Sequence, residues 1–520
     1  MKKFILILFL LNCSLIFGQI TWQKYYDYNQ NIDYLTSAKF TFDNGLILAG
    51  ETNSGGGTIR DIRVIKCDSL GDTLWTKVFD ASENLQSARI IQTQDSGYLL
   101  MGTYAEWQGN QSIIYLIKLN ANGDTTWTKA FGGAFEQNGS KVIQTYDGGY
   151  IVVGNTNSYG IGNIDIYVIK TDSVGDSLWT KTYGGSNIEY GLDIAKTHDS
   201  ALVIVGTTYS IDTAGNVYLM KINLQGDTLW TKSYGGIDYD GAGSINGTRD
   251  SGFIISGATH SFGLNNTDVY LIKINSIGDT LWTKTYGGTG TESGAVEETS
   301  DSGYIFTGLT DSFGAGYFDM YVFKTDYFGN VLWSKTYGQS YADVGGFGKQ
   351  TPDKGYIFAG YGVSGSVSYD YDVYLIKTDS VGNSGCNEQN APTIVGYTQT
   401  TVSFPNFSIS TGGQIAITDF SESNGSGVIT TACISTNIEE TYNIESNVDL
   451  YPNPATSVFT VKSNAPIDEI KLINQMGQMV YNEFGNNNTE LNLNLNLSIG
   501  IYIVQIRCNN KIFYRKITIQ

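Results

Sequence analysis

The sequence has little histidine, proline or cysteine and a shortage of positive charge, and each shortage excludes something. Two histidines, His198 and His260, stand at different repeat positions in loop-like surroundings, which argues against histidine-based catalysis and His/Cys metal clusters. There are 31 basic and 50 acidic side chains, so the formal net charge is −19. Because phosphate binding depends on clustered Lys and Arg, we expect no nucleic-acid partner and no binding to anionic membranes.

Long apolar runs are also missing beyond the N-terminus. No later stretch approaches the ~20 apolar residues of a membrane-spanning helix. The N-terminus itself has two lysines, an apolar run that reaches Phe17 and a small residue at Gly18. This is the pattern of a secretion signal peptide over residues 1–18, removed beside Gln19. We therefore expect an exported protein with no transmembrane segment after signal removal.

Glycine and tyrosine are abundant, at 62 and 36 residues, which suits short strands joined by tight turns. Tryptophan recurs at a nearly constant spacing, most often inside the phrase Asp-Thr-Leu-Trp-Thr-Lys-x-Tyr-Gly-Gly. The seven repeated residues are Trp22, Trp75, Trp127, Trp179, Trp230, Trp282 and Trp333. A fixed period of about 50 residues indicates a propeller or a solenoid.

Each unit contains an Asp-x-Gly turn before an apolar strand, then an alternating strand, then an Asp-Ser-x-Gly-Asp turn before the Trp strand. Four short strands per unit are typical of a propeller blade. The last unit lacks a Trp strand, whereas the first Trp strand, residues 20–26, precedes the first full unit. We therefore predict an all-β fold with a seven-bladed β-propeller over residues 20–386, closed by the N-terminal strand, which removes exposed edges.

The Trp phrase resembles the tryptophan-docking repeat of quinoprotein-type propellers, and the layout is similar to that of kelch-like and other large bacterial propeller repeats. The resemblance is specific for architecture and implies little about activity. Residues 387–447 break the period and are predicted to form an accessory loop or hairpin followed by a polar linker. In an oxidising compartment Cys386 and Cys433, which bracket this segment, are the candidate disulfide.

The final segment, 448–520, resembles the C-terminal sorting domain of the type IX secretion system of Bacteroidota. The resemblance rests on Leu450-Tyr-Pro-Asn-Pro-Ala455, Ile473-Asn-Gln-Met-Gly-Gln478, Gly500-Ile-Tyr-Ile-Val504 and the closing Arg515-Lys-Ile-Thr-Ile519. The sorting-motif residues are Tyr451, Pro452, Asn453, Pro454, Gly477, Gly500, Tyr502 and Lys516. The resemblance implies passage through the periplasm and outer membrane by the type IX machinery, to the medium or cell surface.

Alternating apolar residues predict that this segment is a small immunoglobulin-like β-sandwich, with Ile470, Leu472, Ile501 and Ile503 pointing inward.

Acidic residues are the remaining candidates for a site. The predicted crossing from each outer strand to the next inner strand contains one acid: Asp33, Glu83, Glu136, Glu189, Asp240, Glu292 and Asp343. A second set precedes the alternating strands, at Asp61, Asp165, Asp268, Asp319 and Asp372, and is broken by Ile113 and Asn216. The first set either accepts hydrogen bonds from backbone N–H groups or binds a ligand. Both sets open on the face that carries the longer loops, because chain direction alternates from strand to strand.

Loops held by a rigid scaffold are frequent binding sites. The aromatic residues of these loops either stack on sugars or close each loop over the blade end: Tyr159, Tyr209, Phe262, Phe313 and Tyr361. The near-uniform repeats favour a non-catalytic propeller, surface-attached or released, that binds glycan or protein through the long-loop face. The alternative is a polysaccharide-active enzyme or a quinoprotein-like oxidoreductase. No cofactor is called for, and a Ca²⁺ dependence stays open under both hypotheses.

Overall fold

The computed structural model describes most of the chain as β-strands. The described residues are 19–27, 32–53, 59–80, 84–105, 111–211, 213–264, 266–363, 371–405, 407–410, 414–416, 421–424, 428–436, 448–474, 479–485, 488–495, 497–498, 500–508 and 511–519. The predicted signal peptide, Glu83 and Gly477 lie outside them. Within the described ranges, no helix has the length and apolar character needed to cross a membrane. The chain forms two compact units, which divide between Ser435 and Thr436.

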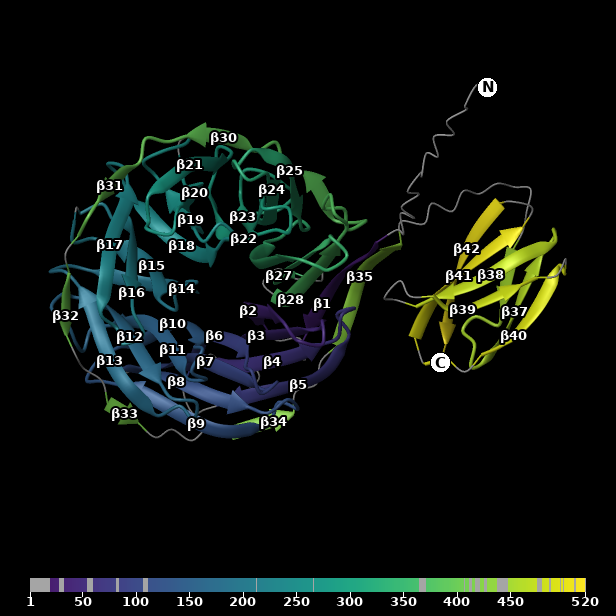
Figure 1. Cartoon of the computed structure of the whole chain (residues 1–520), viewed down its shortest axis with the longest axis horizontal. Coiled ribbons are helices and arrows are strands. Elements are labelled where there is room, and N and C mark those ends of the chain that lie inside the picture. The colour runs from purple at the N-terminus through teal and green to yellow at the C-terminus, as the bar shows by residue number, and fades with distance from the viewer. Residues whose placement is uncertain are drawn as a thin grey trace, which may run out of the picture. The chain divides into compact units, whose positions relative to one another are not determined.

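The first unit is a β-propeller made of seven five-stranded sheets arranged around a common centre (Figure 1). In each sheet, four strands follow one another outward from the centre and a fifth lies at the outer edge. The inner strands are β2 (Asp33–Phe40), β6 (Asn84–Gln92), β10 (Gln137–Gln144), β14 (Glu189–Lys196), β18 (Asp240–Gly247), β22 (Glu292–Glu298) and β26 (Val344–Gln350). The second strands are β3 (Leu46–Thr52), β7 (Tyr98–Ala105), β11 (Tyr150–Thr156), β15 (Leu202–Thr208), β19 (Phe253–Thr259), β23 (Tyr304–Thr310) and β27 (Tyr356–Val363).

The third strands are the alternating strands of the repeat and are buried along almost their whole length. They are β4 (Asp61–Cys67), β8 (Ser112–Leu119), β12 (Asp165–Thr171), β16 (Asn216–Ile222), β20 (Asp268–Ile274), β24 (Asp319–Thr325) and β28 (Tyr371–Thr378). The fourth strands carry the repeated tryptophans: β5 (Thr73–Asp80), β9 (Thr125–Gly132), β13 (Ser177–Gly184), β17 (Thr228–Gly235), β21 (Thr280–Gly287), β25 (Val331–Tyr337) and β1 (Ile20–Asp27). The strand β1 pairs with β28, from Trp22 opposite Lys377 to Tyr26 opposite Val373.

The repeated Trp phrase fastens each fourth strand to the next sheet. In β13, the Trp179 ring nitrogen donates to the Leu224 carbonyl (3.1 Å), the Lys181 ammonium pairs with Asp227 (3.1 Å), and the Tyr183 hydroxyl donates to the Gly226 carbonyl. The same contacts recur from β1, where Lys24 pairs with Asp72 at 2.6 Å and the Tyr26 hydroxyl donates to Gly71. The N-terminal strand therefore makes the lysine and tyrosine contacts to the sheet of β2–β5 that β13 makes to its successor. The strands β5 and β9 keep the lysine ion pair but have Phe79 and Phe131 in place of the tyrosine.

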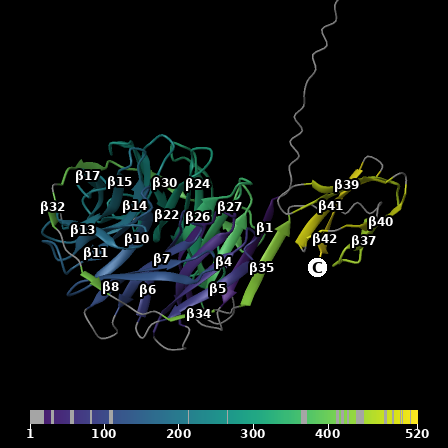
Figure 2. The same ribbon diagram turned by 60° about the horizontal axis from the view of Figure 1, so that its bottom comes forward.

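The fifth strands come from a single segment, residues 388–436, which we term the belt. Its strands are β29 (Glu388–Asn390), β30 (Ile394–Tyr397), β31 (Thr401–Ser403), β32 (Ser408–Ser410), β33 (Gln414–Ala416), β34 (Ser421–Asn424) and β35 (Val428–Thr436). They pair in turn with β25, β21, β17, β13, β9, β5 and β1, so the belt visits the sheets in the reverse of their chain order. Figures 1 and 2 show β32, β34 and β35 at the outer edges of their sheets.

The belt is not the local loop or hairpin that the sequence suggested. A disulfide joins Cys386 and Cys433, which are 47 residues apart. The seven sheets each leave an outer edge with free backbone groups, and such an edge pairs with any extended segment in reach. Fully extended, the segment between the two cysteines can span about 160 Å. Its two ends meet at the disulfide after the chain has visited all seven sheets.

The second unit consists of two sheets packed on one core. A three-stranded sheet contains β36 (Val448–Tyr451), β37 (Val458–Ser463) and β40 (Glu490–Asn494), and a four-stranded sheet contains β39 (Met479–Phe484), β38 (Ile467–Ile473), β41 (Gly500–Cys508) and β42 (Lys511–Ile519). Ile470 and Leu472 are in the core, as expected. In β41 the expectation was wrong for Ile503, which is half-buried, because Tyr502 and Val504 face the core instead. Both alternating sets are apolar at the start of this strand, so the pattern there did not define the inner face; farther along, Gln505 and Arg507 belong to the outer set. The side chain of Ile501 lies outside the described residues.

Candidate functional site

The predicted acids at the start of the inner strands occupy equivalent positions in five of the seven sheets. The residues at this position, each paired with or opposite the end of the second strand, are Asp33, Leu85, Gln137, Glu189, Asp240, Glu292 and Asp343. Glu136 is exposed and lies one residue before this position. The sequence predicted an acid in every crossing, but only five sheets have one at the equivalent position. In the third sheet Gln137 occupies that position, because Glu136 lies one residue before it.

These buried carboxylates hold the backbone of the preceding turn. Glu189 accepts a hydrogen bond from the Gly185 amide at 2.7 Å and another from the Thr208 hydroxyl at 2.9 Å. The contacts of Glu292 with Gly288 and Thr310 repeat this arrangement. A buried carboxylate needs such donors, and here they come from its own turn and the adjacent strand. The geometry gives these acids a structural role.

The second predicted set lies next to the first. An added Cβ at Gly287 would lie 2.3 Å from an oxygen of Asp268 and 2.4 Å from an oxygen of Glu292. The carboxylates of a third strand and of the next inner strand thus converge on the glycine that ends the Tyr-Gly phrase. This close approach explains why a residue without a side chain follows the tyrosine in most repeats. Ile113 and Asn216 interrupt the set at matching positions.

Burial raises the pKa of several of these acids. Burial, with the nearby charge of Glu189 adding to it, raises the pKa of Asp165 to about 6. Burial raises the pKa of Asp343 to about 7, and the charge of Asp319 acts in the same direction. Raised carboxyl pKa values can mark catalytic acids, but here they recur from sheet to sheet with the repeat.

The variant Asp343→Asn tests the structural role. In the wild type, the stability contributed by protonated Asp343 is complete below the unfolded pKa of about 3.9 and is lost as pH rises through about 7. An amide carries no charge, and Gln137 shows that this position accepts one. We expect the variant to melt roughly 1–3 °C higher than the wild type at pH 8 and at the same temperature at pH 4. Asp238→Asn, which removes an exposed charge, is the control; equal shifts in both variants would contradict this role.

The repeat is broken on the loop face, where β2 meets the sheet of β26–β28 and β1. Three half-buried tyrosines from these strands contact one another there, and we term them, with Arg60 and Glu51, the seam cluster. Tyr34 lies 5.0 Å from Tyr361 and 5.4 Å from Tyr371 between ring centroids, and Tyr361 lies 5.6 Å from Tyr371. The Arg60 guanidinium lies 5.4 Å above the Tyr34 ring and pairs with the buried Glu51.

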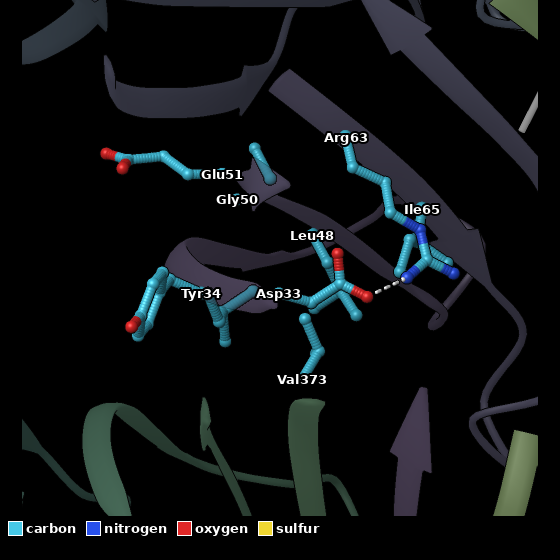
Figure 3. Close-up of a pocket in the computed structure, with 10 residues that line it drawn as sticks. Asp33, Tyr34, Leu48, Gly50, Glu51, Arg63, Ile65 and Val373 are labelled. Carbon is cyan, nitrogen blue, oxygen red and sulfur yellow. Dashed lines mark hydrogen bonds and ion pairs between the residues drawn. The ribbon is translucent and has the colours of Figure 1, made fainter. Parts of the chain in front are cut away.

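A small pocket lies beside this cluster and is lined by a buried ion pair. Arg63 donates to Asp33 at 2.9 Å, and both side chains are at most 5% exposed (Figure 3). The other six third strands have a tyrosine at the position of Arg63: Tyr115, Tyr167, Tyr218, Tyr270, Tyr321 and Tyr374. Oxygens of Asp27, Asp33 and Asp372 lie within 4.8 Å of one another. Arg63 supplies one positive charge to this group of three carboxyl groups.

The five predicted loop aromatics divide into two kinds. Tyr159, Phe262 and Phe313 each lie over the third-strand tyrosine of their own sheet, at 5.6–6.1 Å between centroids, and so close their loops. Tyr209 stacks on Tyr239 at 6.5 Å, and Tyr361 belongs to the seam cluster. His198 and His260 are exposed. Only the aromatics that meet residues of a neighbouring sheet remain candidates for binding.

In the second unit, Asn453 joins two of the sequence landmarks. Its side-chain amide donates to the Lys516 carbonyl at 2.7 Å, and its side-chain oxygen accepts from the Thr518 amide at 2.9 Å. The Ala455 amide donates to the Thr518 carbonyl at 2.8 Å. The Tyr-Pro-Asn-Pro segment is therefore bound to the edge of β42, the last strand of the chain.

The remaining motif residues divide between the surface and the interior. Tyr451, Pro452, Pro454 and Lys516 are exposed. Tyr502 is buried, and its hydroxyl donates to the Ser498 carbonyl at 2.9 Å, while Gly500 begins β41. The Asn453 side chain binds the segment of Tyr451, Pro452 and Pro454 to the strand that contains Lys516. These four exposed side chains are therefore accessible to a partner.

Residues 449–520 match the family described as the secretion system C-terminal sorting domain. The second unit is thus a type IX sorting domain, as its landmarks predicted. A protein that carries this domain is exported by the type IX secretion machinery, to the outer membrane or the medium. No curated protein is significantly similar in sequence to the whole chain.

Solved structures resemble the chain at low similarity. An α-L-arabinanase from Penicillium chrysogenum, complexed with arabinobiose, has 9% identity and a TM-score of 0.41, over 70% of this chain and 98% of its own. An α-L-arabinofuranosidase mutant from Fusarium graminearum, bound to an iminosugar inhibitor, has 11% identity and a TM-score of 0.39 over the same shares. Sqt1 from Chaetomium thermophilum has 9% identity and a TM-score of 0.38, over 65% and 82%. Similarities at this level carry no argument about activity.

Proposed function

We propose that the protein is an exported, non-catalytic, seven-bladed β-propeller, closed by its N-terminal strand, that binds a glycan through the seam cluster on its loop face. The domain order is a signal peptide over 1–18, the propeller over 20–386, the belt and linker within 387–447, and an immunoglobulin-like sorting domain over 448–520. The exported protein is released or held at the cell surface. The seven sheets and the pairing of β1 with β28 support the closed ring.

The seam cluster is the observation that carries the binding proposal. Ligand sites combine aromatic walls with a few polar groups that fix orientation. Tyr34, Tyr361 and Tyr371 are half-buried, so their rings keep exposed surface on which the C–H face of a sugar can lie. The Arg60–Glu51 pair beside Tyr34 offers donors and acceptors to hydroxyl groups. Within the described ranges, the other junctions between sheets do not reproduce this combination of three tyrosines with an Arg–Glu pair.

The acids support binding without hydrolysis. Glycoside hydrolysis uses two carboxyl groups that reach the bond from either side of the sugar. Glu189, Asp240 and Glu292 are fully buried and accept hydrogen bonds from the protein itself. The polysaccharide-active alternative is favoured by one feature, the Asp27, Asp33 and Asp372 group next to the seam cluster. The Asp33–Arg63 ion pair argues against that alternative, because the Asp33 carboxylate is buried and bound to Arg63.

Binding to a panel of insoluble polysaccharides tests the proposal. We expect Tyr34→Ala and Tyr361→Ala to weaken retention of the purified protein on the preferred polymer at least tenfold, which corresponds to about 1.4 kcal/mol. Tyr317→Ala removes an 83% exposed tyrosine from another loop of the same face and is the matched control. Equal losses in all three variants, or none in the seam variants, would exclude the seam cluster as the site. Absence of any glycan binding would redirect the search to protein partners.

A further inference from the structure

Six of the seven inner strands, which surround the centre of the propeller (Figure 1), carry a charged side chain in their second half. Six such side chains are Lys39 on β2, Arg89 on β6, Lys141 on β10, Asp193 on β14, Glu297 on β22 and Lys349 on β26. Lys141 pairs with Asp193 at 2.8 Å, Lys349 lies 3.8 Å from Glu297, and Lys39 lies 5.8 Å from the ring of Phe347 on β26. Each of these contacts joins the inner strands of two adjacent sheets.

The positive charges in this group outnumber the negative ones by four to two. Asp193 and Glu297 are each used by one lysine. Arg89 donates to the backbone carbonyls of Thr36, Ala88 and Ser140. Among the described residues, no carboxylate lies within ion-pairing distance of the Lys39 ammonium. The centre of a protein with a formal net charge of −19 thus contains an excess of positive charge.

Titration of Lys39 agrees with this geometry. Burial, followed by the charge of Lys141, lowers the pKa of Lys39 to about 8, and Lys349 acts in the same direction. Glu297 and Asp193 oppose the shift without cancelling it. An ammonium group in such a place lacks the acceptor that would stabilise its charged form.

The channel has room at this level. Gly346 on β26 is exposed, and an added Cβ there would meet no atom within 4 Å. Phe347, which contacts Lys39, is the next residue. Lys349, which faces the same channel, is exposed.

We propose that the central channel binds a small oxyanion between Lys39, Lys141 and Lys349. The three ammonium groups are donors without acceptor capacity, and phosphate, sulfate or carboxylate oxygens are their natural partners. The anion is either a free ion or the acidic group of a sugar, since the recognising chemistry is the same. This inference does not depend on glycan binding at the seam cluster, which lies at the loop ends of its strands.

Binding depends on pH through Lys39. The charged groups that act on it are Lys141, Glu297, Lys349 and Asp193, and its pKa is about 8. A bound anion favours the ammonium form, so binding near pH 8 takes up a proton. For sulfate, whose charge does not change in this range, we expect affinity to be constant between pH 6 and 7 and to fall as pH rises above 8.

Calorimetric titration of the full chain with inorganic phosphate at pH 7 tests the proposal, with sodium chloride of equal ionic strength as reference. We expect saturable binding that weakens at least tenfold in Lys39→Met, whereas Lys462→Met, an exposed lysine of the sorting domain, binds as the wild type does. Lys349→Met provides a second variant if Lys39→Met fails to fold. Titrations with sulfate and glucuronate distinguish the sources: binding of all three supports a general oxyanion site, and binding of glucuronate alone supports an acidic sugar. No saturable binding of any of the three, or equal binding by Lys39→Met, would overturn the proposal.

Discussion

Replacing Asn453 with alanine is expected to leave most of the protein inside the cell, in the periplasm. The Asn453 side chain makes both hydrogen bonds that fasten the Tyr-Pro-Asn-Pro segment to Lys516 and Thr518. Each lost hydrogen bond is exposed, so its loss costs about 0.5–1.5 kcal/mol. The exposed Tyr451 and Lys516 are then no longer held together as one surface for the secretion machinery. The propeller is a separate compact unit, so it should still fold.

Immunoblotting of medium, cell surface and periplasm measures this effect in a host with type IX secretion. Asn453→Asp keeps the acceptor for the Thr518 amide and loses the donor to Lys516, so an intermediate level of export is expected. Asn482→Ala removes an exposed amide from β39 in the same domain and is the control. Wild-type export of Asn453→Ala would show that this contact is not needed for recognition.

Replacing both Cys386 and Cys433 with serine is expected to release the belt. Most belt strands have three or four residues and pair with the propeller along one edge. The disulfide closes a loop whose entropy in the unfolded chain corresponds to about 4 kcal/mol. It also lies where the ring of sheets is completed, because Gln23 and Thr21 of β1 donate to Ser384 at 2.8 and 2.9 Å. Without it, belt and N-terminal strand should open together.

Limited proteolysis followed by mass spectrometry locates the cuts, and thermal melting gives the loss of stability. We expect the double variant to be cut first within residues 388–436 and to melt several degrees lower, roughly as 2–4 kcal/mol requires. Reductant should reproduce both effects in the wild type and change nothing in the double variant. Cys67 and Cys508 are buried free thiols and remain in both proteins. Equal protease resistance of the two proteins would show that strand pairing alone retains the belt.

The propeller could be predicted from the sequence because its signals repeat. Trp179, Lys181 and Tyr183 each contact the next sheet, and their counterparts recur in the other repeats, so sequence period and structural period coincide. The belt could not be predicted in the same way. Its strands are too short for alternation to show, and each pairs with a different sheet far away in the sequence. The disulfide between Cys386 and Cys433 could be predicted from the sequence, but the pairing of the belt strands between them could not.

The site was only partly predictable for a related reason. Tyr361 was visible as a loop aromatic, but its partners Tyr34 and Tyr371 become neighbours only when the last sheet meets the first. Separating Tyr361 from Phe313 requires knowing which ring lies over a third-strand tyrosine. The central lysines gave a weak signal that was missed: Lys39 stands where β6 and β10 have Ile91 and Ile143.

The most direct test of the account incubates the purified protein with the polysaccharide panel and records retention together with release of soluble sugar. The account predicts retention that depends on Tyr34 and Tyr361, with no release of product at any pH from 5 to 8. Release of soluble sugar that is abolished by Asp33→Asn or Asp372→Asn would contradict it and assign the seam to a hydrolase.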